Sequence, residues 1–140
     1  MGKLNQKRSD KADDSSKIKL LKILIVDDNI TIGMVLCELM REYSKEIFIA
    51  ESGEEAITIF ENNPDIDLIM MDTYMPRMSG AETTSRIRQF HTKVVIIIET
   101  AFHLSEITEE FAGVAIDDYL PKPFNKFSIN QLILKHFSNN

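Results

Sequence analysis

From Lys19 onward, short apolar runs alternate with segments in which apolar residues recur every three or four positions. The first pattern predicts buried strands, and the second predicts helices with one apolar face. Strands are predicted at residues 20–26, 47–50, 67–72, 94–100 and 118–120. Four of the helices between and after them have their apolar positions at Ile32–Tyr43, Ala56–Phe60, Ile107–Val114 and Ile129–Phe137. One further helix is predicted from the end of the loop at 73–80 to about His91. The chain is therefore predicted to contain five strand–helix units.

The predicted strands are apolar on both faces, which is typical of a parallel sheet covered by helices on both sides. Right-handed crossovers between such strands give an α/β, doubly wound, five-stranded sheet. Ligands in these folds bind beyond the carboxyl ends of the strands. Residues that directly follow each strand are therefore the first candidates for function.

Local signals mark several helix ends. Ser52 and Glu55 have the spacing of a capping box at the start of the second helix. Asn63-Pro64 predicts the end of that helix. Asn125 or Ser128 is the expected N-cap of the last helix.

The 140 residues carry a net charge of −6, and their number predicts one domain. Residues 1–17 contain five basic and three acidic side chains, whereas the remainder contains eleven basic and nineteen acidic. Only three of the first 17 residues are apolar, so we expect a disordered arm at 1–17 and a folded domain at 18–140. The acidic body argues against direct binding of nucleic acid.

The sequence also lacks the signals of membrane or secreted proteins. No apolar run approaches the ~20 residues of a membrane span, and no secretory signal is visible. Cys37 is the single cysteine and fits a reducing compartment. We therefore expect a cytoplasmic protein without membrane contact.

Polar residues with metal or phosphate chemistry lie at the carboxyl ends of the predicted strands. They are Asp27 and Asp28 after the first strand, Asp72 at the end of the third, Thr100 at the end of the fourth and Lys122 after the fifth. A single aspartate at a strand end is usually a turn former or a helix cap. Because the carboxyl ends of parallel strands meet at one edge, however, all five side chains should converge.

Clustered carboxylates repel one another, by about 4 kcal/mol for two charges ~4 Å apart at an effective dielectric near 20. Such a group should hold either protons or a cation. Oxygen-only ligands suit Mg²⁺, which also favours phosphate. A carboxylate is a competent nucleophile for phosphoryl transfer, and Lys122 and Thr100 could neutralise and bond the phosphoryl oxygens.

Four motifs resemble the receiver domains of two-component signalling, the response-regulator family, in their chemotaxis-regulator-like form. They are ILIVDDN at 23–29, MMDTYMPRMSG at 70–80, ETA at 99–101 and DYLPKPF at 118–124. The resemblance extends from Lys22 to about His136. It implies a flavodoxin-like sheet of order 2-1-3-4-5 with five helices in three layers.

The resemblance also implies roles for individual residues. Asp72 matches the phosphoacceptor, Asp27 and Asp28 match the Mg²⁺-binding pair, and the backbone carbonyl of Tyr74 matches the third protein ligand of the metal. These assignments would make Mg²⁺ the cofactor of the site.

Three further roles follow from the same resemblance. Thr100 matches the hydroxyl that moves to meet the phosphoryl group, and Tyr119 matches the aromatic ring that turns inward with it. Lys122 matches the cation that binds the phosphoryl oxygens, and the Lys122–Pro123 bond is expected to be cis.

A receiver of this kind is a phosphorylation-dependent switch and not an enzyme. A histidine kinase or a histidine phosphotransfer protein would phosphorylate Asp72. The face made by the fourth helix, the fifth strand and the fifth helix would then regulate an unknown downstream protein. We expect a monomer or a weak phosphorylation-dependent dimer, either as a stand-alone receiver or as a module of a hybrid histidine kinase or a longer response regulator.

Two other functions fit the sequence less well. A Mg²⁺-dependent phosphohydrolase with an aspartyl nucleophile usually carries a second carboxylate two residues later, where this chain has Tyr74. A flavodoxin-like nucleotide binder needs a phosphate loop after the first strand, where Asp27-Asp28-Asn29 would repel phosphate.

Two residues depart from the family pattern. Glu99 precedes Thr100, where the family normally has an aliphatic residue, and on a buried strand it needs a partner or a raised pKa. Phe102 is large and apolar where small or polar residues are common. Neither residue is among those that match the family's phosphoacceptor, metal ligands, switch residues or lysine.

Overall fold

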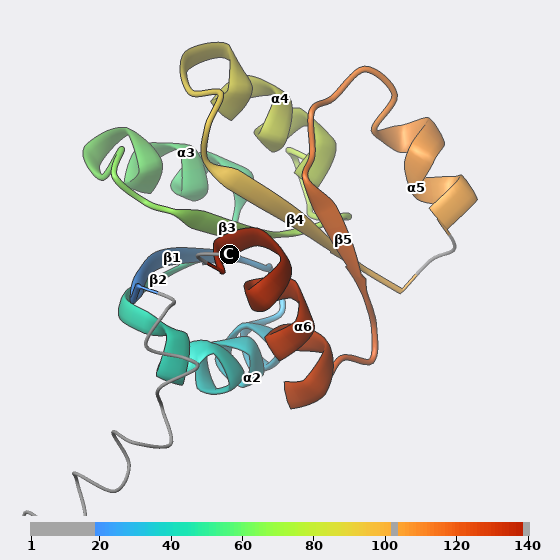
Figure 1. The fold of residues 1–140 in the computed structure, drawn as a ribbon. Coiled ribbons are helices and arrows are strands. Elements are labelled where there is room, and N and C mark those ends of the chain that lie inside the picture. The colour runs from blue at the N-terminus through green and yellow to red at the C-terminus, as the bar shows by residue number, and fades with distance from the viewer. Residues whose placement is uncertain (1–18, 102–103, 139–140) are drawn as a thin grey trace, which may run out of the picture.

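The five apolar runs form the strands of one parallel sheet, and the helices between them lie on its two faces (Figure 1). The computed structural model describes residues 19–101 and 104–138, so the predicted arm at 1–17 and Phe102 lie outside the described residues. The strands are β1 (Leu21–Val26), β2 (Ser44–Ala50), β3 (Leu68–Asp72), β4 (Val95–Thr100) and β5 (Asp118–Pro121). The helices are α2 (Ile30–Met40), the 3₁₀ turn η2 (Arg41–Tyr43), α3 (Gly53–Asn62), α4 (Gly80–Phe90), α5 (Leu104–Glu110) and α6 (Lys126–Phe137).

The strand order is β2-β1-β3-β4-β5, and every neighbouring pair is parallel. This topology confirms the predicted doubly wound fold. The order reverses at β1, whose two neighbours β2 and β3 lie on opposite sides of it. A crevice between β1 and β3 at the carboxyl edge is the expected ligand position in such a sheet. The topology therefore brings the ends of β1 and β3 to the place where function is expected.

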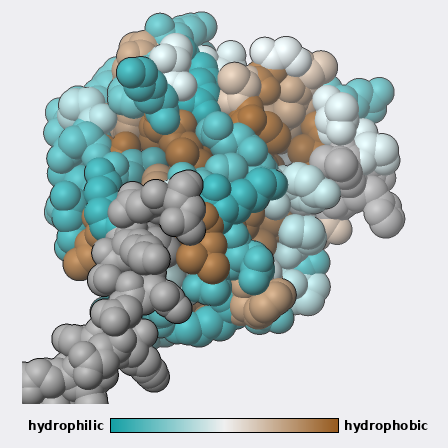
Figure 2. Space-filling model, viewed as in Figure 1, coloured by the Kyte–Doolittle hydropathy of each residue, from teal (hydrophilic) through white to brown (hydrophobic). Residues whose placement is uncertain are grey.

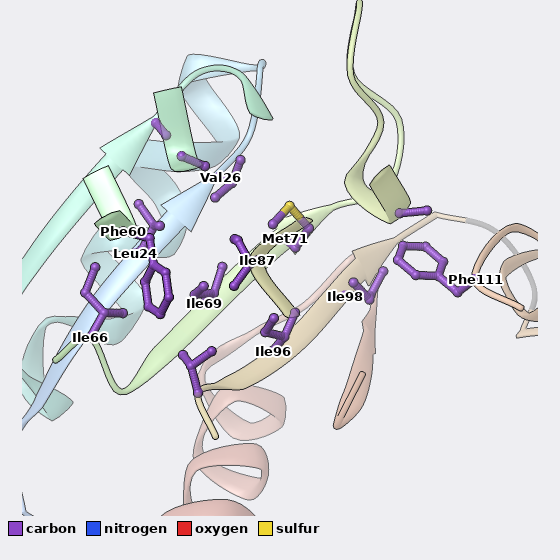
Figure 3. Packing of buried hydrophobic residues seen from close by; sticks show 14 of the residues in the cluster. Leu24, Val26, Phe60, Ile66, Ile69, Met71, Ile87, Ile96, Ile98 and Phe111 are labelled. Carbon is purple, nitrogen blue, oxygen red and sulfur yellow. The ribbon is translucent and has the colours of Figure 1, made fainter. Parts of the chain in front are cut away.

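Each face of the sheet buries its own apolar cluster, because successive side chains of a strand point to opposite sides. On one face, α3, α4 and α5 pack over strand residues that include Leu24, Ile69 and Ile98 (Figures 1 and 3). On the other face, α2 and α6 pack over the alternate residues, including Ile25 and Met70. These two buried layers hold the strand ends in fixed positions.

The outer surface is mainly polar. Figure 2 shows hydrophilic side chains over much of the face seen in Figure 1, with smaller hydrophobic areas among them. Within residues 19–101 and 104–138, no helix is long and apolar enough to cross a membrane.

The helix caps agree only in part with the sequence pattern. Ser52 caps α3 by accepting a hydrogen bond from the Glu55 N–H, as predicted. The reciprocal bond of a capping box is not formed, because the Glu55 carboxylate accepts from the N–H of Glu51 instead. At the start of α6, Asn125 is the N-cap, and Ser128 completes a capping box with it.

The fourth predicted helix is shorter than its apolar pattern indicated. It ends at Glu110, and the chain then turns through Gly113, whose φ of 79° lies in the left-handed region. Phe111 is still buried, and Val114 packs against the same core although it lies beyond the helix. The prediction of a helical Val114 was wrong because apolar contact continues across the turn.

Candidate functional site

Asp27 and Asp28 directly follow β1. The side chain of Asp27 is only 1% exposed, whereas Asp28 is exposed to solvent. The backbone N–H of Asp27 still bonds the carbonyl of Ala50, so this residue continues the β1–β2 ladder. Its Oδ1 atom accepts a hydrogen bond of 2.8 Å from the N–H of Asn29. Asn29 is in turn the N-cap of α2. The acidic pair is thus held by the junction between a strand and a helix.

Asp72 is the last residue of β3 and is 7% exposed. Its Oδ1 atom accepts a hydrogen bond of 2.9 Å from the N–H of Thr73. The loop that follows folds back tightly, because the N–H of Gly80 donates to the carbonyl of Thr73 at 2.9 Å. A Cβ at Gly80 would lie 1.9 Å from the carbonyl oxygen of Asp72, so only glycine fits there.

The three predicted aspartates converge. Asp27, Asp28 and Asp72 each offer a carboxylate oxygen, and these three atoms lie within 4.8 Å of one another. Two of the side chains are buried and one is open to solvent. The structure therefore forms the acidic cluster that the strand-end pattern predicted.

Lys122 brings a positive charge to the same place. Its Nζ lies 3.4 Å from Asp72 Oδ1. The backbone N–H of Lys122 donates to the carbonyl of Thr100 at 2.7 Å, which ties the end of β5 to the end of β4. The Lys122–Pro123 peptide bond is cis.

Thr100 and Tyr119 lie on one face of neighbouring strands. Tyr119 pairs with Ile98 in the β4–β5 register, and Thr100 is two residues beyond Ile98 on the same strand face. Thr100 is buried, whereas Tyr119 is half-buried and packs against the cluster beneath α3, α4 and α5. The two side chains therefore lie on the same side of the sheet.

The environment of Asp72 favours its protonated form. Burial, and then the negative charge of Asp27, raise the pKa of Asp72 from 3.8 to about 6, although Lys122 and the Thr73 N–H act in the opposite direction. At neutral pH the group is still mostly ionised. Its carboxylate is consequently more basic than an ordinary aspartate and remains available as a nucleophile.

Glu99 is a fourth carboxyl group on this edge. It pairs with Asp72 in the β3–β4 register and is fully buried. Burial raises the pKa of Glu99 well above its ordinary value, as do Asp27 and Asp72, whereas Lys122 opposes the rise. The sequence correctly indicated that a carboxyl group here would need a partner or a raised pKa.

Two residues that the sequence did not single out support the site. Thr73 is buried, donates its N–H to Asp72, and donates its hydroxyl to the carbonyl of Glu99 at 2.8 Å. Asn29 donates its backbone N–H to Asp27. The only available signal was the position of each residue directly beside an acidic residue at a strand end.

The donor set fits a hard divalent cation. All three grouped side chains offer carboxylate oxygen, which is the ligand type that Mg²⁺ prefers. Asp28 lies at the solvent side, which leaves room for the water molecules that Mg²⁺ retains. In addition, Asp27 Oδ2 is buried without a hydrogen-bond partner among the described residues.

Comparison with known protein families gives one match over most of the chain. The model described as "Response regulator receiver domain" matches residues 23–134. This range contains all of the acidic residues described above together with Lys122.

Individual relatives agree with this match. The transcriptional regulatory protein CpxR of Escherichia coli K12 is 35% identical over 105 residues, which are 74% of this chain but only 44% of that protein. The chemotaxis protein CheY of Halobacterium salinarum is 34% identical over 112 residues, covering 80% of this chain and 92% of CheY. The chain therefore spans less than half of the first relative and nearly all of the second.

A solved structure shows the same fold. The receiver domain of the sensor histidine kinase PA1611 from Pseudomonas aeruginosa PAO1 superposes with a TM-score of 0.75 and 27% identity. The superposition covers 83% of this chain and 96% of that domain, and the PA1611 domain holds a magnesium ion in its active-site cleft.

Proposed function

The chain belongs to the response regulator receiver domain family, and on that premise we propose that Asp72 accepts a phosphoryl group and so switches the domain between two signalling states. The observation that carries the proposal is the convergence of Asp27, Asp28 and Asp72 within 4.8 Å, together with Lys122 Nζ at 3.4 Å from Asp72. This combination of oxygen ligands, a nucleophilic carboxylate and a cation is what phosphoryl transfer requires.

In the proposed step, a carboxylate oxygen of Asp72 attacks the phosphorus of a phosphohistidine. The P–N bond breaks, an aspartyl O–P bond forms, and the histidine nitrogen takes up a proton. The Lys122 ammonium offsets charge on the transferred oxygens, and the Thr100 hydroxyl donates a hydrogen bond to one of them. The Thr73 N–H, which contacts Asp72 Oδ1, helps to fix the orientation of the carboxylate.

Asp27, Asp28, Asp72 and the backbone carbonyl of Tyr74 would hold Mg²⁺. The ion supplies charge neutralisation between the carboxylates and the incoming phosphoryl group. The magnesium ion in the related PA1611 domain supports this assignment.

The signal would leave through α5, β5 and α6. Tyr119 lies on β5 and shares a sheet face with Thr100, so movement of the Thr100 hydroxyl toward a phosphoryl group would change the packing space of the ring. The proposed phosphoryl donor is a histidine kinase or a histidine phosphotransfer protein. The chain itself would be a monomer or a weak phosphorylation-dependent dimer that regulates a downstream protein.

The position two residues after Asp72 supports a switch over a phosphohydrolase. This position holds Tyr74, which is 49% exposed and offers no carboxylate for general acid catalysis. Because the match with CpxR covers 44% of that protein, a longer regulator or a hybrid kinase that contains this domain is the alternative form of the same proposal.

Acetyl phosphate with Mg²⁺ gives a direct test. We expect intact-mass spectrometry to detect one phosphoryl adduct on the wild type and none on Asp72→Asn. Asp65→Asn is the matched control, because Asp65 is exposed and precedes β3 at the opposite edge of the sheet. An adduct of undiminished size on Asp72→Asn would remove Asp72 from the proposed role.

A further inference from the structure

Thr73 is a polar residue in a buried position, directly after the proposed phosphoacceptor Asp72, and is only 2% exposed. Its N–H donates to Asp72 Oδ1 at 2.9 Å, and its hydroxyl donates to the carbonyl of Glu99 at 2.8 Å. Its own carbonyl accepts from the N–H of Gly80 at 2.9 Å. One residue thus connects the acceptor carboxylate, the end of β4 and the start of α4.

The bond to the Glu99 carbonyl bears on Thr100, because that carbonyl belongs to the peptide group that joins the two residues. Thr100 is the last residue of β4 and is buried. On its other side, its carbonyl accepts from the N–H of Lys122 at 2.7 Å. The backbone of Thr100 is therefore held between two donors, the residue that follows Asp72 and the lysine of the site.

The Thr73 hydroxyl is well suited to such an anchor. Two heavy atoms on the Cβ of threonine restrict rotation about χ1, so the hydroxyl keeps its direction. Both Thr73 and Glu99 are buried, so water cannot readily replace the bond. The paired register of β3 and β4 ends at Asp72 and Glu99, and the hydroxyl extends the connection between the two strands by one residue.

We propose that the Thr73 hydroxyl is a positioning group of the phosphorylation site, which fixes the backbone of Thr100 relative to Asp72 and so places the Thr100 hydroxyl to bond the transferred phosphoryl group. The inference rests on the proposed function, because it requires that Asp72 is phosphorylated and that Thr100 bonds a phosphoryl oxygen. Thr73 acts in this role through the backbone of β4 and not through contact with the phosphoryl group.

Two substitutions separate the hydroxyl from the bulk of the side chain. Thr73→Val removes the hydroxyl and keeps the shape, whereas Thr73→Ser keeps the hydroxyl and loses a methyl group. The measurement is the rate of adduct formation with acetyl phosphate and Mg²⁺, followed by intact-mass spectrometry on the full chain. We expect Thr73→Val to react about tenfold more slowly than the wild type, since a misplacement of about 1 Å can cost about 10²-fold. Thr73→Ser should recover most of the rate.

Thr83 on α4 provides the matched control. It is fully buried, and its hydroxyl donates to the carbonyl of Ser79 at the same distance of 2.8 Å. Thr83→Val should lower the melting temperature to an extent similar to Thr73→Val and leave the rate of adduct formation unchanged. If Thr73→Val does not fold, Thr73→Ala and Thr83→Ala provide the same comparison.

A double-mutant cycle tests whether Thr73 acts through Thr100. Thr100→Val should by itself slow adduct formation, because it removes the hydroxyl that is to bond the phosphoryl oxygen. Adding Thr73→Val to Thr100→Val should then slow the reaction by less than about twofold, because no hydroxyl is left to position. Equal slowing by Thr73→Val in both backgrounds would overturn the proposed route through Thr100.

The remaining outcomes separate this inference from the proposed function. Equal rates for the wild type and Thr73→Val overturn the positioning role and leave phosphorylation of Asp72 standing. Equal slowing in Thr73→Ser or in Thr83→Val also overturns it, in favour of a general packing defect. A wild type that forms no adduct, or an adduct that persists in Asp72→Asn, contradicts the proposed function itself.

Discussion

At the scale of single residues, the site concentrates buried carboxyl groups that oppose folding. Asp27, Asp72 and Glu99 are each at most 7% exposed, and burial is the first cause of the raised pKa at both Asp72 and Glu99. Such groups lower the stability of the native state at neutral pH. Bound protons or a bound cation can offset this loss of stability.

Asp72→Asn should stabilise the protein at neutral pH in the absence of divalent cations. The pKa of Asp72 rises from 3.8 to about 6 on folding, so the native state binds the proton more tightly. The resulting penalty is absent below pH 3.8, develops between 3.8 and about 6, and is complete above that range. At complete development it corresponds to at most about 3 kcal/mol of unfolding free energy.

Urea unfolding with a chelator between pH 5 and pH 8 measures this effect. The stability gain of Asp72→Asn should be larger at pH 7.5 than at pH 5. Asp65→Asn should give no gain, because a hydrogen bond from Lys22 holds the pKa of Asp65 below its ordinary value. A gain from Asp72→Asn that is the same at all pH values would contradict the assigned cause.

The sequence predicted the residues of the site better than their contacts. Asp27, Asp72 and Lys122 lie at or directly after the carboxyl ends of strands, and a parallel sheet brings such positions together regardless of loop conformation. The hydrogen bonds from Thr73 and Asn29 depend on loop backbone directions. Residue types along the chain do not encode those directions, so these contacts were not predictable.

At the scale of elements, the apolar pattern predicted all five strands, with boundaries that shifted by a few residues. β2 begins at Ser44 instead of Ile47, because the backbone pairing with β1 extends past the apolar residues. α5 ends before Val114, because apolar side chains continue to reach the core after the helix turns away. Burial therefore predicts where a segment packs, whereas hydrogen bonding determines where an element ends.

Gly80→Ala should both destabilise the protein and slow phosphorylation. A Cβ at this first residue of α4 would lie 1.9 Å from the carbonyl oxygen of Asp72, and backbone atoms cannot move away cheaply. Overpacking of this kind costs about 1–3 kcal/mol. The required shift moves the end of β3, so the rate of adduct formation with acetyl phosphate should fall together with the melting temperature.

Gly33→Ala is the matched control within a helix. Its added Cβ would lie 3.7 Å from Ile49 Cγ2, an ordinary contact, and Gly33 lies in the interior of α2. Alanine there should stabilise the protein by roughly 0.5–1 kcal/mol. If Gly80→Ala were as stable and as reactive as Gly33→Ala, the close approach of α4 to β3 would have no influence on the acceptor.

At the scale of the whole molecule, the acidic site links cation binding to folding. Asp27 and Asp28 follow β1 and Asp72 ends β3, so unfolding separates the cluster and removes the repulsion between its members. A cation that binds the native cluster offsets this repulsion and stabilises the fold by RT ln(1 + [L]/Kd). Global stability should therefore report on occupancy of the site.

We expect the melting temperature of the wild type to rise with Mg²⁺ concentration and the rise to be much smaller in Asp28→Ala. At a Mg²⁺ concentration of 100 times the dissociation constant, the added stability is about 2.7 kcal/mol. Asp28 is the exposed member of the cluster, so its removal leaves no buried cavity and takes away one repulsive charge. The metal-free variant should consequently melt at the same temperature as the wild type or higher.

Potassium chloride at matched ionic strength serves as the control for simple screening of surface charge. An Mg²⁺ response that is identical in the wild type and Asp28→Ala would show that the cluster is not the binding site, because repulsion relieved elsewhere on the acidic surface would then account for the entire effect.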